Sequence, residues 1–132
     1  MHAHAYFAHP VTVRPEDIDD MGHVNNVVYL RWVQEVATAH WLAKSTPSLR
    51  DAHAWVVLRH EIDYRAPVYL GDALVGQTWV GKAEGARFDR WVRLLKGDVT
   101  VAEAKTIWCL LDSASGKPKR IPAEIEQLLA LP

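Results

Sequence analysis

The sequence of 132 residues contains a single cysteine, Cys109, so it can form no internal disulfide and offers no cysteine-based zinc site. It has no apolar run long enough to span a membrane. Residues 1–10 lack the basic start and long apolar stretch of a signal peptide. These absences agree with a cytoplasmic location and argue against a membrane partner.

Neither sign of charge is in excess, because 15 Lys and Arg residues face 16 Asp and Glu residues and give a formal charge of −1. General binding to nucleic acid is therefore not expected. His2, His4 and His9 lie close together near the start of the chain, but no other type of metal ligand accompanies them, so we predict no metal site.

The remaining composition is that of an ordinary globular protein, with 49% hydrophobic and 23% charged residues. There is no repeat, linker or low-complexity segment, so residues 1–132 are predicted to form one domain. Six tryptophans are many for this length, and they are expected in the core or at an interface.

Hydrophobic periodicity predicts one strand, one long helix, a series of strands and a short final helix. The long helix is expected over residues 26–43, with Asn25 or Asn26 as its N-cap. Its apolar face is predicted to carry Leu30, Val33, Ala37 and Trp41. The strands are expected at residues 6–13, 55–64, 73–82, 87–96 and 99–112, and the final helix at residues 122–131.

Residues 55–64 alternate in polarity, which is typical of a strand with one buried face. The buried face is expected to carry Val56, Leu58, His60, Ile62 and Tyr64. One apolar helix with consecutive antiparallel strands predicts an α+β fold whose sheet wraps around the helix. The outer face and the edges of such a sheet need cover, which a partner subunit would supply.

The segment from Asp17 to Tyr29, DIDDMGHVNNVVY, places three carboxylates, a histidine and two asparagines just before the long helix. A helix N-terminus offers free N–H groups that stabilise an oxyanion, and a nearby carboxylate serves as nucleophile or general base. Gly22 allows a backbone conformation that other residues avoid. These are the components of acyl transfer, although the same residues also describe an ordinary capped helix start.

This segment resembles the signature of hotdog-fold acyl-CoA thioesterases of the 4-hydroxybenzoyl-CoA thioesterase-like family. The matching pattern runs from Asp17 through Gly22-His23-Val24-Asn25-Asn26 to Trp32. Two weaker likenesses follow in the expected order, at residues 59–72 and 116–122. The resemblance implies a curved antiparallel sheet around one central helix, a homodimer or homotetramer with the site at a subunit interface, and no cofactor.

The same resemblance implies roles for single residues. Asp19 aligns with the catalytic carboxylate, as general base or nucleophile, and the backbone N–H of Asn26 aligns with the oxyanion donor. His23 occupies the histidine position of the motif. In related acyl-carrier thioesterases an Asp-x-Asn-x-His arrangement contributes to catalysis, but this chain has Met21 in place of the Asn. His23 is therefore interpreted either as an orienting or polarising group of the site or as a hydrogen-bonded loop histidine.

Other residues are candidates for substrate binding or for structural roles. Tyr29 is expected in the core or as a wall of the acyl pocket, and Gly22 is expected to border the substrate. Lys82 and Arg87 flank one turn and are the preferred ligands for the phosphates of CoA, ahead of Arg90 and three other cations, Lys117, Lys119 and Arg120. Asp17 is interpreted as structural, His60 as a core histidine and Cys109 as a small buried apolar residue.

The sequence therefore predicts hydrolysis of an acyl-CoA, or of an acyl-carrier-protein thioester, to a free carboxylic acid. Two alternatives stay open. Some hotdog proteins hydrate enoyl thioesters with an Asp and a His, and the chain could instead bind acyl-CoA or acyl carrier protein without turnover.

Overall fold

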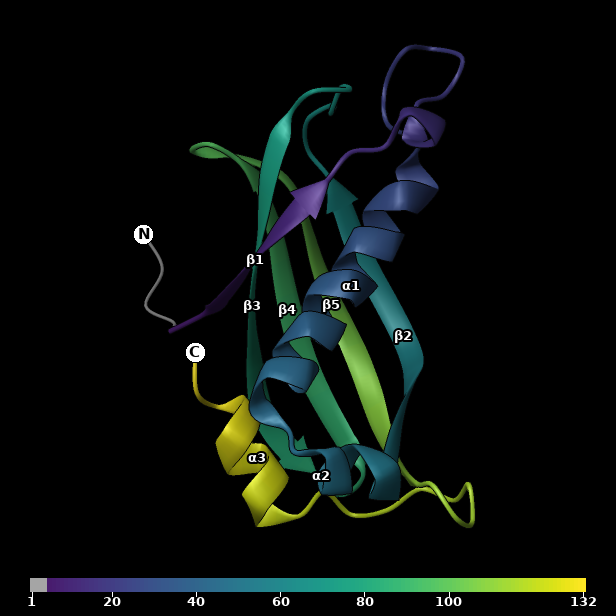
Figure 1. The fold of residues 1–132 in the computed structure, drawn as a ribbon, viewed down its shortest axis with the longest axis vertical. Helices are drawn as coiled ribbons and strands as arrows, with labels where there is room; N and C mark the ends of the chain where they lie inside the picture. Colours follow the sequence, from purple (N-terminus) through teal and green to yellow (C-terminus); the bar gives the residue numbers. More distant parts are fainter. Residues whose placement is uncertain (1–4) are drawn as a thin grey trace.

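One long helix lies along one face of five strands in the computed structural model, which describes residues 5–132 (Figure 1). In chain order the elements are β1 (Phe7–Thr12), the 3₁₀ helix η1 (Pro15–Asp17), α1 (Asn26–Lys44), α2 (Pro47–Ala52), β2 (His53–Tyr64), β3 (Ala73–Glu84), β4 (Arg87–Lys96), β5 (Val99–Asp112) and α3 (Ala123–Leu129). All of them except η1 and α2 are predicted from the sequence. Helix α2 forms directly after the long helix ends, because Thr46 caps it and Pro47 supplies its first residue.

The five strands form one antiparallel sheet in the order β1-β3-β4-β5-β2. The strand before α1 joins the same sheet by pairing with β3, as predicted. Strands β3, β4 and β5 follow one another through tight hairpins, whereas β2 lies at the far edge beside β5. The sheet curves around α1, which confirms the predicted α+β fold (Figure 1).

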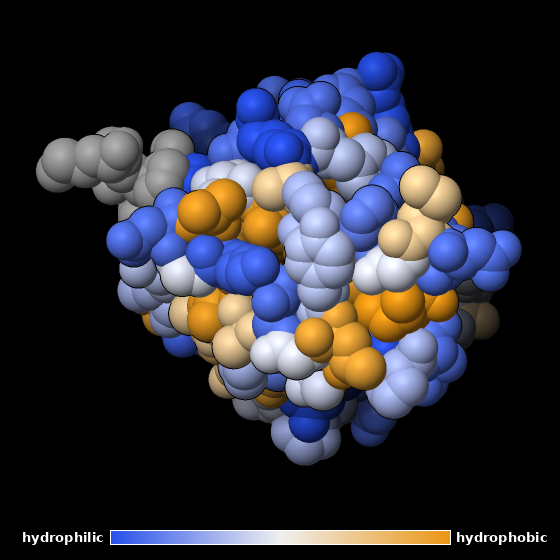
Figure 2. Space-filling model, turned by 90° about the horizontal axis from the view of Figure 1, so that it is seen from above, coloured by the Kyte–Doolittle hydropathy of each residue, from blue (hydrophilic) through white to orange (hydrophobic). Residues whose placement is uncertain are grey.

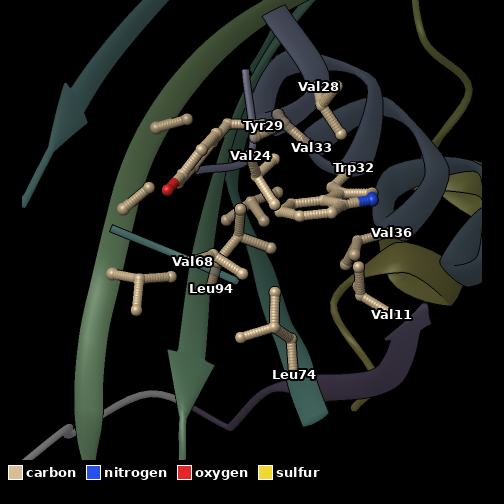
Figure 3. Close-up of a cluster of buried hydrophobic side chains, with 14 residues drawn as sticks. Val11, Val24, Val28, Tyr29, Trp32, Val33, Val36, Val68, Leu74 and Leu94 are labelled. Atoms are coloured by element: carbon tan, nitrogen blue, oxygen red, sulfur yellow. The ribbon is translucent and has the colours of Figure 1, made fainter. Parts of the chain in front are cut away.

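Helix α1 buries a face that is turned from the predicted one. Its fully buried residues are Val28, Tyr29, Trp32, Val33, Val36, Ala37 and His40. Leu30 and Trp41, which the helical spacing placed on the buried face, lie only partly buried at its margins. Trp32 belongs to the larger core cluster and is fully buried, with side chains from the helix and the sheet near it (Figure 3). No helix of the described residues is long and apolar enough to cross a membrane.

Strand β2 contains an irregularity that reverses its faces. Its pairing with β5 shifts register between Val57 and Arg59. Before this bulge the half-buried residues are Trp55 and Val57, and after it they are His60 and Ile62. The prediction that Val56 and Leu58 are buried is therefore wrong, since both are exposed. Tyr64, expected on the same buried face, is exposed as well. A bulge inserts one extra residue and so inverts the alternation that follows it.

Helix α1 packs closely on β3 at a glycine. A Cβ atom built on Gly76 would overlap the side chain of Val36, which lies in the fully buried core (Figure 3). Only glycine therefore lets the helix approach the sheet at this point.

We expect Gly76→Ala to lower the free energy of unfolding by about 1–3 kcal/mol, because overpacking in a filled core forces the helix off the strand. Urea denaturation measures the change. The double variant Gly76→Ala/Val36→Ala should be more stable than the sum of the two single effects predicts, since the second change removes the overlap. Strictly additive effects would contradict the close packing.

Candidate active site

The segment before α1 forms a small hairpin, here called the acid loop (residues 17–25). Residues Ile18 and Val24 form an antiparallel bridge, and the N–H of Asp19 donates to the carbonyl of His23 at 2.7 Å. The N–H of Asn25 donates to the carbonyl of Asp17 at 2.9 Å. The acid loop is therefore a defined structure and not an irregular connection.

The carboxylate of Asp19 is oriented by the backbone of its own loop. Its Oδ1 atom accepts from the N–H of Met21 at 2.9 Å and from the N–H of His23 at 3.3 Å. Its Oδ2 atom accepts no hydrogen bond from residues 5–132, and the residue is only partly buried. One oxygen thus fixes the group, and the other is available to a water molecule or a substrate.

Gly22 makes this turn possible. Its φ angle is +80°, in the left-handed region, and its N–H donates to the carbonyl of Asp19 at 3.0 Å. A side chain at this position would strain the backbone, although nothing lies within 4 Å of where its Cβ would be. The expected conformational role of Gly22 is confirmed, and its contact with substrate stays a prediction.

Asp17 holds the acid loop to the helix. It is 2% exposed, and its two carboxylate oxygens accept from Nη1 and Nη2 of Arg31 at 2.8 and 2.9 Å. Oδ2 also accepts from the N–H of Arg14. The hydrogen bonds from Arg31, its charge and that of Arg14 lower the pKa of Asp17, against the opposing effect of burial. Its structural role, expected from the sequence, is confirmed.

The first turn of α1 leaves an N–H group free. Asn25 is the N-cap, and its Oδ1 atom accepts from the N–H of Val27 at 3.1 Å. The N–H of Asn26 donates to no atom of residues 5–132, while its carbonyl accepts from the hydroxyl of Tyr64. An unpaired N–H at a helix N-terminus is the kind of donor that stabilises an oxyanion.

His23 and Tyr29 are held in different ways. The ring of His23 is partly buried and lies edge-on to the ring of Tyr69, at 5.3 Å between centroids. Tyr29 is in the core, and its hydroxyl donates to the carbonyl of Ala66 at 3.1 Å. Burial raises the pKa of Tyr29. Core packing is thus observed for Tyr29, and its contribution to an acyl pocket stays a prediction.

The two preferred phosphate ligands lie at the opposite end of the folded molecule from the acid loop. Lys82 and Arg87 are exposed at the β3–β4 turn, close to α3, whereas the acid loop lies at the N-terminal end of α1 (Figure 1). Helix α1 separates the two ends by about 28 Å. A single chain does not bring these cations to Asp19. Arg90, the other arginine near this turn, is buried and does not serve as a surface ligand for phosphate.

Several residues near the acid loop were not identified from the sequence. Arg31 and Tyr69 lie outside the loop along the chain, and the carbonyl of Val68 accepts from the N–H of Val24 at 2.8 Å. Arg31 also forms an ion pair with Glu35 one turn along α1. The i,i+4 spacing of Arg31 and Glu35 predicts this pair on the helix surface, but it does not predict the contact of Arg31 with Asp17. Nothing local in the sequence indicates that Arg31 reaches Asp17.

His60 and Cys109 have the environments expected from the sequence. His60 is half-buried and its Nδ1 lies 2.8 Å from Oγ1 of Thr106, while burial lowers the pKa of His60. Cys109 is buried. His2 and His4 lie outside the described residues, and His9 lies in β1. Within residues 5–132 no three His, Cys, Asp or Glu side chains are grouped so that they could hold a metal ion.

A five-stranded antiparallel sheet curved around one long helix is the fold of the hotdog class of proteins. Residues 13–129 match the model of the thioesterase-like superfamily, and the chain belongs to this family.

Two curated relatives resemble the chain over most of their length. A 1,4-dihydroxy-2-naphthoyl-CoA hydrolase of Prochlorococcus marinus is 26% identical over 136 residues, which cover 96% of this chain and 91% of the relative. An acyl-CoA thioester hydrolase, YbgC, of Escherichia coli O6:H1 is 27% identical over 123 residues, or 90% and 92% of the two chains. A thioesterase of Thermus thermophilus, solved with coenzyme A and zinc, superposes with a TM-score of 0.82 at 25% identity and covers 92% of this chain and 90% of its own.

We expect Asp17→Asn to lower the free energy of unfolding by about 2–3 kcal/mol at neutral pH, the range for losing charge-assisted hydrogen bonds. The larger loss of stability that follows from breaking a fully buried ion pair is not expected, because the Arg31 side chain is 34% exposed and water can solvate its charge. The pKa of Asp17 is lowered in the folded state, so its stabilisation is complete above the unfolded pKa of about 3.9 and is lost as the pH falls through the folded pKa.

Urea denaturation between neutral and acid pH tests this effect. The difference between wild type and Asp17→Asn should shrink below pH of about 3.9. Glu35→Gln is the matched control, because it removes the exposed carboxylate that contacts the same Arg31 and should change stability by less than about 0.5 kcal/mol. Equal effects of the two variants would show that the buried pair does not hold the acid loop.

Proposed function

We propose that this protein hydrolyses an acyl-CoA thioester to a free carboxylic acid and CoA, with Asp19 as general base or nucleophile. The observation that carries the proposal is the Asp19 carboxylate, held through Oδ1 by two backbone N–H groups, with Oδ2 left open. The names of the relatives, both hydrolases of CoA thioesters, support the substrate class.

The reaction breaks the bond between the acyl carbon and sulfur and forms a bond between that carbon and oxygen. As general base, Asp19 takes a proton from water while the water oxygen attacks the acyl carbon, and the sulfur leaves as the CoA thiol once protonated. As nucleophile, Asp19 forms an acyl anhydride that water then hydrolyses. In both cases the carbonyl oxygen becomes negatively charged, and the free N–H of Asn26 is the donor proposed to stabilise it.

The placement of the cations supports a site shared between two copies of the chain. If Lys82 and Arg87 bind the CoA phosphates, they belong to a different subunit from the Asp19 that they serve, because α1 separates them in one chain. A two-fold homodimer with opposed α1 helices brings the basic end of one copy to the acid loop of the other. The end of the molecule with the acid loop also carries apolar patches among polar groups (Figure 2). Its exposed apolar residues include Met21, Val27 and Leu70.

Asp19→Asn is expected to keep the fold and to lower kcat by about 10²–10⁴-fold, the usual contribution of a positioned base. Asn retains an oxygen that accepts from Met21 and His23, so the acid loop stays closed. The measurement is free-thiol release from short, long and aromatic acyl-CoAs. Asp20→Asn is the matched control, since Asp20 is the exposed neighbouring acid, and its activity should equal that of wild type.

Substantial hydrolysis by folded Asp19→Asn would overturn the assigned mechanism. If wild type binds acyl-CoA but releases no thiol, the binding-protein alternative replaces the hydrolase. A crotonyl thioester that loses its enoyl absorbance without releasing thiol would instead indicate a hydratase. The cytoplasmic location stays a prediction.

A shared site makes a further prediction about mixed assemblies. Asp19→Asn and the double variant Lys82→Ala/Arg87→Ala should each be weakly active alone. Refolded together in equal amounts, they should regain about a quarter of wild-type activity, because half of the two-fold dimers are mixed and each of these has one complete site. Sedimentation should show a dimer or larger assembly. If the mixed protein exchanges subunits but regains no activity, the proposal of a shared site is wrong. Either Asp19 and the two cations then act within one chain, or Lys82 and Arg87 do not contribute to the site.

A further inference from the structure

A small cavity lies between the last turns of α1, the sheet and α3, at the end of the molecule away from the acid loop. Its volume is about 50 Å³, and its walls are mainly apolar, formed by Trp41, Trp55, Val80, Phe88 and Leu129. Exposed Thr38 is part of the lining, so the cavity reaches the surface there. Thr38 is roughly 18 Å along α1 from Asn26, and the cavity is therefore separate from Asp19 of the same chain.

A buried cation without a counter-ion lines this cavity. Arg90 is 5% exposed, and its Nη1 donates to Nδ1 of His40 at 3.0 Å and to Oγ1 of Thr78 at 2.9 Å. Its Nε and Nη2 atoms donate to no atom of residues 5–132, and no carboxylate of those residues lies within 4.0 Å of it. Buried charges in proteins are normally paired.

The neighbours of Arg90 do not neutralise it. A guanidinium only donates, so Nδ1 of His40 is the acceptor, and its Nε2–H donates to the carbonyl of Leu131 at 3.0 Å. Burial and the charge of Arg90 lower the pKa of His40 to about 4, so the ring is neutral at physiological pH. Burial lowers the pKa of Arg90 to about 10, which leaves the guanidinium protonated.

A second hydrogen-bond donor in the lining is also unsatisfied. The indole Nε1 of Trp108 is buried and has no hydrogen-bond partner among the described residues. An indole N–H is a donor only, so the group that completes it must be an acceptor. That N–H is closed off from accessible space, so the charged donor that the cavity offers beside its apolar wall is the guanidinium of Arg90.

We propose that this cavity binds a small monocarboxylic acid, with its carboxylate on Arg90 and its alkyl group among the aromatic side chains. One water-sized sphere occupies about 10–15 Å³, so the cavity takes a group of roughly three to five non-hydrogen atoms, such as acetate or propionate. Charge selects an anion, since a carboxylate matches the donor geometry of a guanidinium. The apolar wall favours an alkyl group over a purely inorganic anion.

Titration of the purified protein with acetate, propionate and butyrate, at constant ionic strength, tests the proposal. Three of the six tryptophans line the cavity, so intrinsic fluorescence reports occupancy, and calorimetry gives the dissociation constant. Propionate should bind in a saturable way, and uncharged propionamide at least about tenfold more weakly, because it cannot compensate the guanidinium. Benzoate should bind more weakly than propionate, because its ring exceeds the cavity.

Variants separate the two contributions. Arg90→Gln should weaken propionate at least about tenfold. Ala37→Leu, which fills the cavity from buried Ala37 without touching the cation, should abolish binding while thermal unfolding stays cooperative. If Arg90→Gln does not fold, Ala37→Leu decides the question. Asp19→Asn should bind propionate as wild type does, since Asp19 does not line the cavity.

Several results would overturn the proposal. These are equal affinity for propionate and propionamide, unchanged binding in folded Ala37→Leu, or no saturable binding at millimolar concentrations. If chloride alone saturates the same signal and an alkyl group adds nothing, the site is an inorganic anion site and the proposed carboxylic acid is wrong.

Discussion

The ion pair between Asp17 and Arg31 is the constraint on which the candidate site depends. It joins a carboxylate buried at the start of the acid loop to a guanidinium in the second turn of α1. Because the carbonyl of the same Asp17 accepts from the N–H of Asn25, the loop and the helix N-terminus are fixed to each other. The orientation of the Asp19 carboxylate and the free N–H of Asn26 are both set within this frame.

The rest of the fold separates two chemically different ends. The sheet curves around α1 and holds it along its length through the core around Trp32 and the close approach at Gly76. Carboxylates and a free N–H lie at one end of the helix, and the exposed Lys82 and Arg87 lie at the other. A helix that is too long to let the two groups meet in one chain makes assembly part of the proposed chemistry.

The sequence predicts the order of elements well, because each signal is local. Hairpins at residues 84–86 and 97–98 and the helical spacing after Asn26 require only neighbouring residues. The inward face of β2 could not be predicted, since the bulge near Leu58 depends on pairing with β5, which is distant in sequence. The partner of Asp17 and the isolation of Arg90 are also tertiary facts. A periodic pattern predicts which residues face the core, but it does not predict whether a buried arginine has a carboxylate as its counter-ion.

The hydrogen bonds that orient Asp19 come from main-chain N–H groups, and this has an evolutionary consequence. Position 21 contributes its N–H and nothing else to the carboxylate, and its side chain is 77% exposed. Any residue except proline supplies that donor. Drift at this position is therefore close to neutral for the geometry of the acid, and the identity of the side chain at Met21 carries no information about how Asp19 is oriented.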